Sequence, residues 1–237
     1  MSTLYFIRHG QASFGKEDYD ALSETGERQS ERLAAYLKEH DFVFDKIYVG
    51  PQVRHRQTAR PLLDLCRQQG RNSFEVEEIP EMAEYDFGAV LSTIVPLLVE
   101  NDEDMNRDAS RMFTDGAAFK RIFEAAALRW VTGDYPSSDL MSWPSFVGRV
   151  NRGLDKIMAR DGRGRRVAVF TSGGPLAVAV QKALGLSDVM AMRLNWQIVN
   201  CSLTRFKCTP EQLMLASFNE YPWLREAGPG GRLVTYK

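Results

Sequence analysis

Three consecutive residues near the start of the chain carry side chains that can bind an anion and attack it. Arg8, His9 and Gly10 directly follow the apolar run Leu4-Tyr5-Phe6-Ile7. Arg8 is a permanent cation, and the neutral imidazole of His9 is a nucleophile suited to phosphorus because its reference pKa is about 6.5. A strand-end histidine beside a surface arginine explains the triplet equally well by itself, so the remaining sequence has to decide.

A second arginine occupies an equivalent position after another apolar run. Residues 46–49 read as a strand, and Gly50-Pro51 opens a helix that presents Arg54 and runs to about Cys66. A guanidinium group can hold two phosphate oxygens at once, so Arg54 is predicted to bind phosphate. Arg56 and Arg60 are expected on the solvated face.

A third run, 167–170, ends in Thr171-Ser172-Gly173-Gly174-Pro175 and continues as a helical pattern. Ser172 suits the N-cap, and glycines let the backbone approach a ligand closely, so Ser172 and Gly173 are predicted to bind phosphate at the helix start. An ordinary capped helix is the alternative, although it explains the paired glycines less well.

A leaving alkoxide needs a proton, which a carboxylic acid kept partly protonated by burial can supply. Glu84 is the preferred donor because it lies in the segment between the second helix and the following helical region, where a substrate would enter. Glu81 and Asp86 stay open, since composition does not separate three nearby carboxylates.

The elements that position these residues alternate between short apolar runs and amphipathic helical patterns. This alternation predicts an α/β fold: a three-layer α/β/α sandwich with a largely parallel sheet. Ligands in such sheets lie beyond the carboxyl ends of the strands, where the residues named above are found. Residues 202–206 and 213–218 are expected to form edge strands, and 228–231 a loose tail.

Between the strands, residues 92–142 read as mostly helical. We expect residues 1–237 to form a single domain that carries 92–142 as an inserted helical cap. The helix that follows the cap leads back to the strand at 167–170, so the core resumes after the insertion.

Composition narrows the function classes. The chain has 237 residues, with 30 basic and 31 acidic side chains and a net charge of −1, so neither nucleic acid nor a membrane surface is an expected partner. Three cysteines without a CxxC pattern fit a reducing, cytoplasmic location. Three scattered histidines give a zinc site almost no support, so no metal and no cofactor are expected.

Taken together, the motifs resemble the histidine phosphatase superfamily, which includes the cofactor-dependent phosphoglycerate mutases. The resemblance covers most of the chain. The residues that carry it are Arg8-His9-Gly10, Leu22, Gly26, Gln29, Pro51, Arg54, Gln57, Thr58, Ala59, Glu84, Gly88, Asn200-Cys201-Ser202 and Asn219. It implies a phosphoglycerate mutase-like fold.

The resemblance also implies roles for the site residues. His9 would be the nucleophile, Arg8 and Arg54 would hold the phosphoryl oxygens, and Glu84 would be general acid and then base. The substrate-binding set would be Arg8, Gly10, Arg54, Ser172 and Gly173.

One departure from the family concerns its second histidine, whose usual place Ser172 occupies. A neutral hydrogen bond in place of a charged one would cost about 1 to 2 kcal/mol, or roughly tenfold in rate, and lost preorganised charge could cost more. Adjacent helix residues point about a third of a turn apart, which argues against rescue by His55. Gly50 also stands where the family often has serine.

Three functions compete at this point. The leading hypothesis is a metal-independent phosphatase that hydrolyses a phosphomonoester through a phosphohistidine on His9. The first alternative returns the phosphoryl group to a bound sugar acid, as a mutase does. The second is a weak or silent module that binds phosphate or a phosphopeptide, motivated by Ser172. The expected partner is a small phosphorylated substrate, and the exposed sheet edge permits a homodimer.

Overall fold

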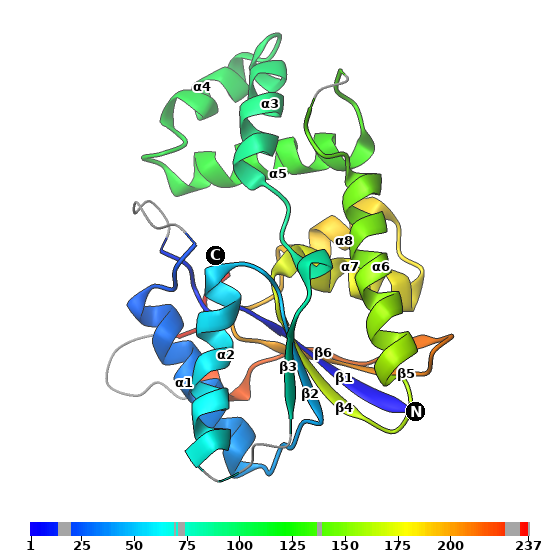
Figure 1. The fold of residues 1–237 in the computed structure, drawn as a ribbon. Helices are drawn as coiled ribbons and strands as arrows, with labels where there is room; N and C mark the ends of the chain where they lie inside the picture. The colour runs from blue at the N-terminus through cyan, green and yellow to red at the C-terminus, as the bar shows by residue number, and fades with distance from the viewer. Residues whose placement is uncertain (14–19, 69, 71–73, 137–138, 226–232, 237) are drawn as a thin grey trace.

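The centre of the structure is a six-stranded sheet with the order β3-β2-β4-β1-β5-β6 (Figure 1). The computed structural model describes residues 1–13, 20–68, 70, 74–136, 139–225 and 233–236. The strands are β1 (Ser2–Arg8), β2 (Lys46–Val49), β3 (Glu75–Glu78), β4 (Arg166–Thr171), β5 (Leu203–Cys208) and β6 (Leu213–Glu220). Strands β1 to β4 are parallel, and β5 and β6 are antiparallel to their neighbours.

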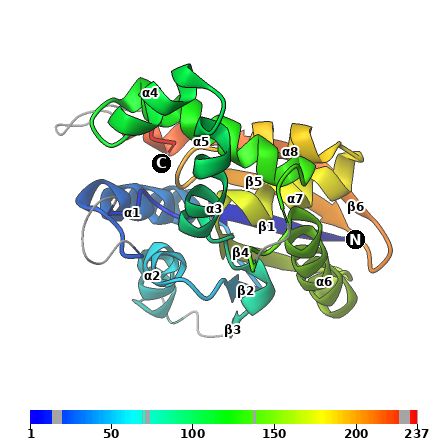
Figure 2. The ribbon, with the colours of Figure 1, turned by 90° about the horizontal axis from the view of Figure 1, so that it is seen from above.

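Helices cover both faces of the sheet. The helices are α1 (Glu24–Glu39), α2 (Val53–Gln68), α3 (Phe87–Val99), α4 (Glu103–Arg111), α5 (Gly116–Thr132), α6 (Trp143–Asp161), α7 (Gly173–Leu184) and α8 (Asp188–Asn195). Two short 3-10 turns span Pro80–Met82 and Pro222–Leu224. Helices α1 and α2 lie on one side of the sheet, and α6 to α8 lie on the other (Figure 2).

The alternation of side chains along β1 shows how the three layers are held together. Leu4 and Phe6 point into the core shared with α6 and α7, whereas Tyr5 and Ile7 point into the core shared with α1 and α2. Successive side chains of a strand leave opposite faces, so a strand buried on both sides reads as a continuous apolar run. The predicted three-layer α/β/α sandwich with a largely parallel sheet is therefore confirmed.

The expected edge position of residues 202–206 is wrong. Strand β5 lies between β1 and β6, and only β6 forms that edge of the sheet. The physical reason is that β5 pairs along its whole length with β1, from Ile7 opposite Leu203 to Ser2 opposite Cys208. The loose tail expected at 228–231 lies outside the described residues.

Helices α3, α4 and α5 stand apart from the sheet, above the carboxyl ends of its parallel strands (Figure 1). The cap was predicted at 92–142, whereas these helices span 87–132, and from here on the helical cap means residues 87–132. Its helices share a small apolar core around Met112, Phe119 and Ile122. Asp108 of α4 receives hydrogen bonds from Arg121 of α5 and from Arg111, which fastens the two helices together.

Candidate active site

His9 is the first residue beyond β1. Its backbone N–H continues the sheet ladder to the carbonyl of Thr171 at 2.9 Å, and its own carbonyl accepts a hydrogen bond of 3.1 Å from Nδ2 of Asn200. Nδ1 lies 2.6 Å from the carbonyl oxygen of Gly10, which can only accept, so Nδ1 carries the proton. The lone pair of the neutral ring therefore lies on Nε2.

Gly10 is required by close packing behind His9. A Cβ atom at this position would lie 2.5 Å from the carbonyl oxygen of Gly26 in α1. The N–H of Gly10 donates to Oγ1 of Thr58 at 3.0 Å, and that hydroxyl donates to the carbonyl of Arg54 at 2.7 Å. Gly26 and Thr58 thus support the loop that carries His9 and do not face the cavity.

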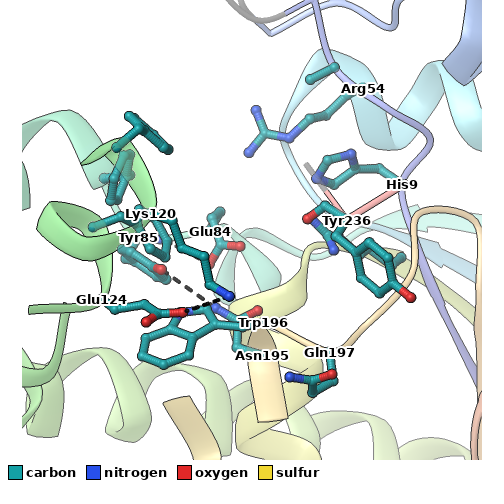
Figure 3. A pocket seen from close by; sticks show the side chains of 15 residues that line it. His9, Arg54, Glu84, Tyr85, Lys120, Glu124, Asn195, Trp196, Gln197 and Tyr236 are labelled. Carbon is teal, nitrogen blue, oxygen red and sulfur yellow. Dashed lines mark hydrogen bonds and ion pairs between the residues drawn. The ribbon is translucent and has the colours of Figure 1, made fainter. Parts of the chain in front are cut away.

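The two predicted arginines both line the same cavity as His9 (Figure 3). Arg8 reaches across the sheet end, where Nη1 donates to the carbonyl of Ile198 and Nη2 donates to the carbonyl of Tyr236 at 3.1 Å. Nη1 of Arg54 forms a 2.7 Å ion pair with Asp20. Asp20 also accepts from the N–H of Val53 at 2.8 Å, so it fixes both Arg54 and the start of α2.

Glu84 lines the cavity between the sheet end and the cap (Figure 3). Its Oε2 accepts a hydrogen bond of 3.0 Å from the N–H of Gly174, and Oε1 accepts one of 3.1 Å from the N–H of Tyr85. The other two carboxylates are occupied elsewhere: Glu81 pairs with Lys156 at the surface, and Asp86 caps α3 by accepting from the N–H of Ala89 at 2.9 Å.

Burial shifts the pKa values of His9 and Glu84 in opposite directions, and both shifts favour the uncharged form. It lowers the pKa of His9 well below its usual range, and the positive charges of Arg54 and Arg8 lower it further. Burial also raises the pKa of Glu84, against the opposing effect of the Gly174 N–H and the arginines. The cavity thus contains an imidazole for which the neutral form is favoured and a carboxyl group for which the protonated form is favoured.

Ser172 and Gly173 are placed differently from the other predicted residues. Ser172 is fully buried, does not line the cavity, and its Oγ lies 2.7 Å from Nε2 of His55. Gly173 begins α7, and a Cβ atom there would collide with the side chain of Asn195. The glycine is thus needed for the close approach of α7 and α8 beside the cavity.

The far wall of the cavity consists of residues that sequence analysis did not identify. The cavity has a volume of about 440 Å³, and aromatic side chains dominate this wall. They are Tyr85, Phe87, Phe119, Phe123 and Trp196, whereas Tyr236 lies on the opposite side, next to His9 (Figure 3). Lys120 and Glu124, one turn apart on α5, form an ion pair of 3.7 Å on the same wall (Figure 3). No sequence motif joins these residues, because they come from the segment just before the cap, from the cap itself and from the residue that follows α8.

The described residues were also searched for a metal-binding cluster and for a helix that could span a membrane. No group of three or more histidine, cysteine, aspartate or glutamate residues is arranged there to hold a metal ion. None of the helices in the described ranges is long and apolar enough to cross a membrane.

Comparison with known proteins identifies the family of the chain. The profile of the histidine phosphatase superfamily (branch 1) matches residues 4–221, so the chain belongs to this family. No curated protein matches the sequence significantly.

Solved structures of similar fold include a phosphoserine phosphatase variant from Entamoeba histolytica in complex with phosphoserine. It is 20% identical, with a TM-score of 0.63, over 94% of this chain and 100% of that one. A putative alpha-ribazole-5'-P phosphatase from Escherichia coli is 17% identical, with a TM-score of 0.62, over 93% and 98% of the two chains. Bacillus stearothermophilus YhfR is 17% identical, with a TM-score of 0.64, over 94% and 99%. At these identities the likeness establishes the phosphoglycerate mutase-like fold.

Proposed function

We propose that this protein is a phosphatase that hydrolyses small phosphomonoesters through a phosphohistidine on Nε2 of His9. The observation that carries the proposal is that one cavity contains Arg8, Arg54, a histidine whose pKa is lowered and a glutamate whose pKa is raised, His9 and Glu84. A neutral imidazole, a protonated carboxyl and two guanidinium groups are the set that such a transfer needs.

In the first step, the Nε2 lone pair of His9 attacks phosphorus while the bond from phosphorus to the ester oxygen breaks. Arg8 and Arg54 hold the phosphoryl oxygens, and Glu84 gives its proton to the leaving alkoxide. In the second step, Glu84 takes a proton from water, the water oxygen bonds to phosphorus, and the bond to Nε2 breaks. Glu84 ends protonated and His9 ends neutral, so the enzyme returns to its starting state.

The aromatic wall supports a leaving group with an apolar or aryl body. Aromatic side chains contribute apolar contact and stacking but few hydrogen bonds, so they favour a planar or hydrophobic alcohol over a highly hydroxylated one. The cavity of about 440 Å³ suits a small molecule. Lys120 and Glu124 add one charge of each sign where a polar substituent of that alcohol could lie.

The test is turnover of para-nitrophenyl phosphate in the presence of a chelator, with acid-labile phosphate on the protein measured in the same samples. We expect both signals in the wild type and neither in His9→Ala. Because the route uses side chains alone, the chelator should not reduce the rate. Turnover that persists in His9→Ala would refute the proposal.

Two alternatives give different results in this assay. A mutase would isomerise a phosphorylated sugar acid faster than it releases phosphate, which requires the cavity to exclude water. A silent module would bind inorganic phosphate without turnover. The buried position of Ser172, which adds no charge to the cavity, is the observation that favours the silent module.

A further inference from the structure

Arg149 of α6 holds the backbone of the residue that carries the proposed acid. Its Nη2 donates to the carbonyl of Ala83 at 2.7 Å, and more weakly to the carbonyl of Glu84 at 3.4 Å. Burial lowers the pKa of Arg149, but the guanidinium group stays charged because arginine loses its proton only in strongly basic solution. Hydrogen bonds from a charged donor are roughly twice as strong as neutral ones, so this contact is a firm link between α6 and the segment before the cap.

The two carbonyls lie on either side of the Glu84 Cα atom. A peptide unit is planar, so the direction of its carbonyl also sets the plane in which the neighbouring Cα atom lies. Holding the carbonyls of Ala83 and Glu84 therefore fixes both backbone dihedral angles of Glu84 and the direction of its Cα–Cβ bond. The carboxyl end of the side chain is held separately, by the N–H groups of Gly174 and Tyr85.

The same face of α6 packs on the chain just before Glu84. Arg149, Gly153 and Lys156 follow one another at helical spacing, so they share one face of α6. A Cβ atom at Gly153 would lie 2.8 Å from Cβ of Glu81, which shows how closely the helix backbone approaches this segment. Lys156 forms an ion pair with Glu81. Arg149 is the contact of this face that reaches the residue lining the cavity.

We propose that Arg149 is a positioning residue, which fixes the backbone of Glu84 so that its carboxyl group meets the ester oxygen of the substrate. This inference rests on the proposed function. Arg149 does not itself line the cavity, so it acts on the reaction only through Glu84. Proton transfer needs the two heavy atoms within about 2.6 to 3.2 Å of each other, and a misplacement of about 1 Å can cost roughly a hundredfold in rate.

Substitutions at position 149 separate this role from packing. Arg149→Met removes the donors and keeps a long apolar stem beside the ring of Phe146, whose centroid lies 5.2 Å from the guanidinium carbon. Arg149→Lys keeps a positive charge and N–H donors on a stem of similar reach. Arg149→Gln, whose side chain is too short to reach the Ala83 carbonyl in the same way, replaces Arg149→Met if that variant does not fold. Single turnovers with enzyme in excess measure cleavage of glycerol phosphate and of para-nitrophenyl phosphate, and so report the first step alone.

We expect Arg149→Met to slow cleavage of glycerol phosphate by about 10- to 100-fold and cleavage of para-nitrophenyl phosphate by less than about threefold, because only the alkoxide needs a proton to leave. Arg149→Lys should stay within about fivefold of the wild type, since it keeps a charged donor. In the Glu84→Gln background, Arg149→Met should cause no further loss, because no acid remains to be placed. Equal losses with both substrates would overturn the inference, as would losses that multiply in the double variant or equal losses in Arg149→Lys and Arg149→Met.

A matched control lies on the same helix. Arg160 donates to Oε1 of Glu77 at 2.8 Å on the surface, so Arg160→Met should leave cleavage of both substrates unchanged. The two proposals fail in different ways. A wild type that cleaves neither substrate, or a Glu84→Gln variant without a selective loss on glycerol phosphate, contradicts the proposed function. A selective loss in Glu84→Gln that is absent in Arg149→Met contradicts the positioning role alone.

Discussion

Oε2 of Glu84 accepts a hydrogen bond of 3.0 Å from the backbone N–H of Gly174. This contact joins the segment that leads into the cap to the first turn of α7. A Cβ atom on Gly174 would collide with the Glu84 carboxylate, so glycine is needed for the approach. The N-terminus of α7 favours the carboxylate form of Glu84, whereas burial favours the acid. Burial is the larger effect, so the pKa of Glu84 is raised overall.

Glu84→Gln should slow transfer from esters with poor leaving groups far more than from para-nitrophenyl phosphate. Glutamine cannot give up a proton, and general acid catalysis contributes about 10² to 10⁴-fold where the leaving alkoxide is strongly basic. We expect at least about a hundredfold loss with glycerol phosphate. The initial burst of para-nitrophenol, which reports the first step alone, should change by less than about tenfold. Equal losses with both substrates would argue against Glu84 as the acid.

The pH dependence of kcat/KM should report the ionisation of both Glu84 and His9. Glu84 must be protonated, so the rate falls as pH rises through its raised pKa; His9 must be neutral, so the rate falls as pH drops through its lowered pKa. Steady-state kcat/KM for an alkyl phosphate should therefore show two limbs, and Glu84→Gln should lack the alkaline one. An alkaline limb that survives in Glu84→Gln would assign it to another group.

Trp196→Ala should impair recognition of the leaving group and spare recognition of phosphate. Trp196 lies on the aromatic wall. Its ring is packed edge to face against Phe123, with 6.2 Å between the ring centroids. We expect kcat/KM for aryl phosphates to fall by about tenfold, the worth of one aromatic contact. The inhibition constant of inorganic phosphate should stay constant, and Trp196→Phe should retain most of the activity. A weaker phosphate inhibition would place Trp196 at the phosphoryl site instead.

Gly50→Ala should destabilise the protein because its methyl group collides with His55. Overpacking in a buried site costs about 1 to 3 kcal/mol. In the His55→Ala background the same change should cost less than about 0.5 kcal/mol, since the ring is no longer there. Urea unfolding of the four proteins measures this coupling. A cost that is the same in both backgrounds would show that some other contact opposes the methyl group.

Stability should decline on the acid side of neutrality because of His55. Its pKa in the folded protein is about 3, against about 6.5 in the unfolded chain, so the unfolded chain binds the extra proton first. The stabilisation is complete above pH ~6.5 and is lost as pH falls toward ~3, by about 1.4 kcal/mol per unit. His55→Gln should therefore lose less stability than the wild type between pH 7 and pH 5 in urea unfolding. Equal slopes would contradict a neutral, buried His55.

Sequence analysis located the sheet well where strands are buried on both faces. The runs at residues 4–7, 46–49 and 167–170 all lie within β1, β2 and β4, because double burial leaves continuous apolar segments. Strand β3 has the sequence Glu-Val-Glu-Glu, and such a pattern gives no apolar signal. It is held by pairing with β2 and by Lys46, which contacts Glu77 at 2.7 Å and Glu75 at 3.3 Å.

Sequence patterns led to residues of the candidate site that lie near strand ends or in the segment before the cap, but not to those that packing alone brings to the cavity. Arg8, His9, Arg54 and Glu84 lie around one cavity, whereas the aromatic wall combines distant segments that share no motif. His55 was expected to point away from the phosphoryl group because it follows Arg54 on the same helix, and its ring does not line the cavity. The contact of His55 with Ser172 could not be predicted from helix geometry, because it depends on the space that Gly50 leaves for the ring.

The strand order also determines when this protein can fold during its synthesis. Within the described residues, β1 pairs with β4 and β5 and no other strand, and neither of these begins before Arg166. Strand β1 is therefore synthesised long before either partner, and its apolar run Leu4-Tyr5-Phe6-Ile7 stays unpaired in the meantime. Non-local pairing of this kind is slow and leaves hydrophobic surface exposed meanwhile. A chaperone that holds the emerging N-terminal segment would thus protect the same strand that later carries His9.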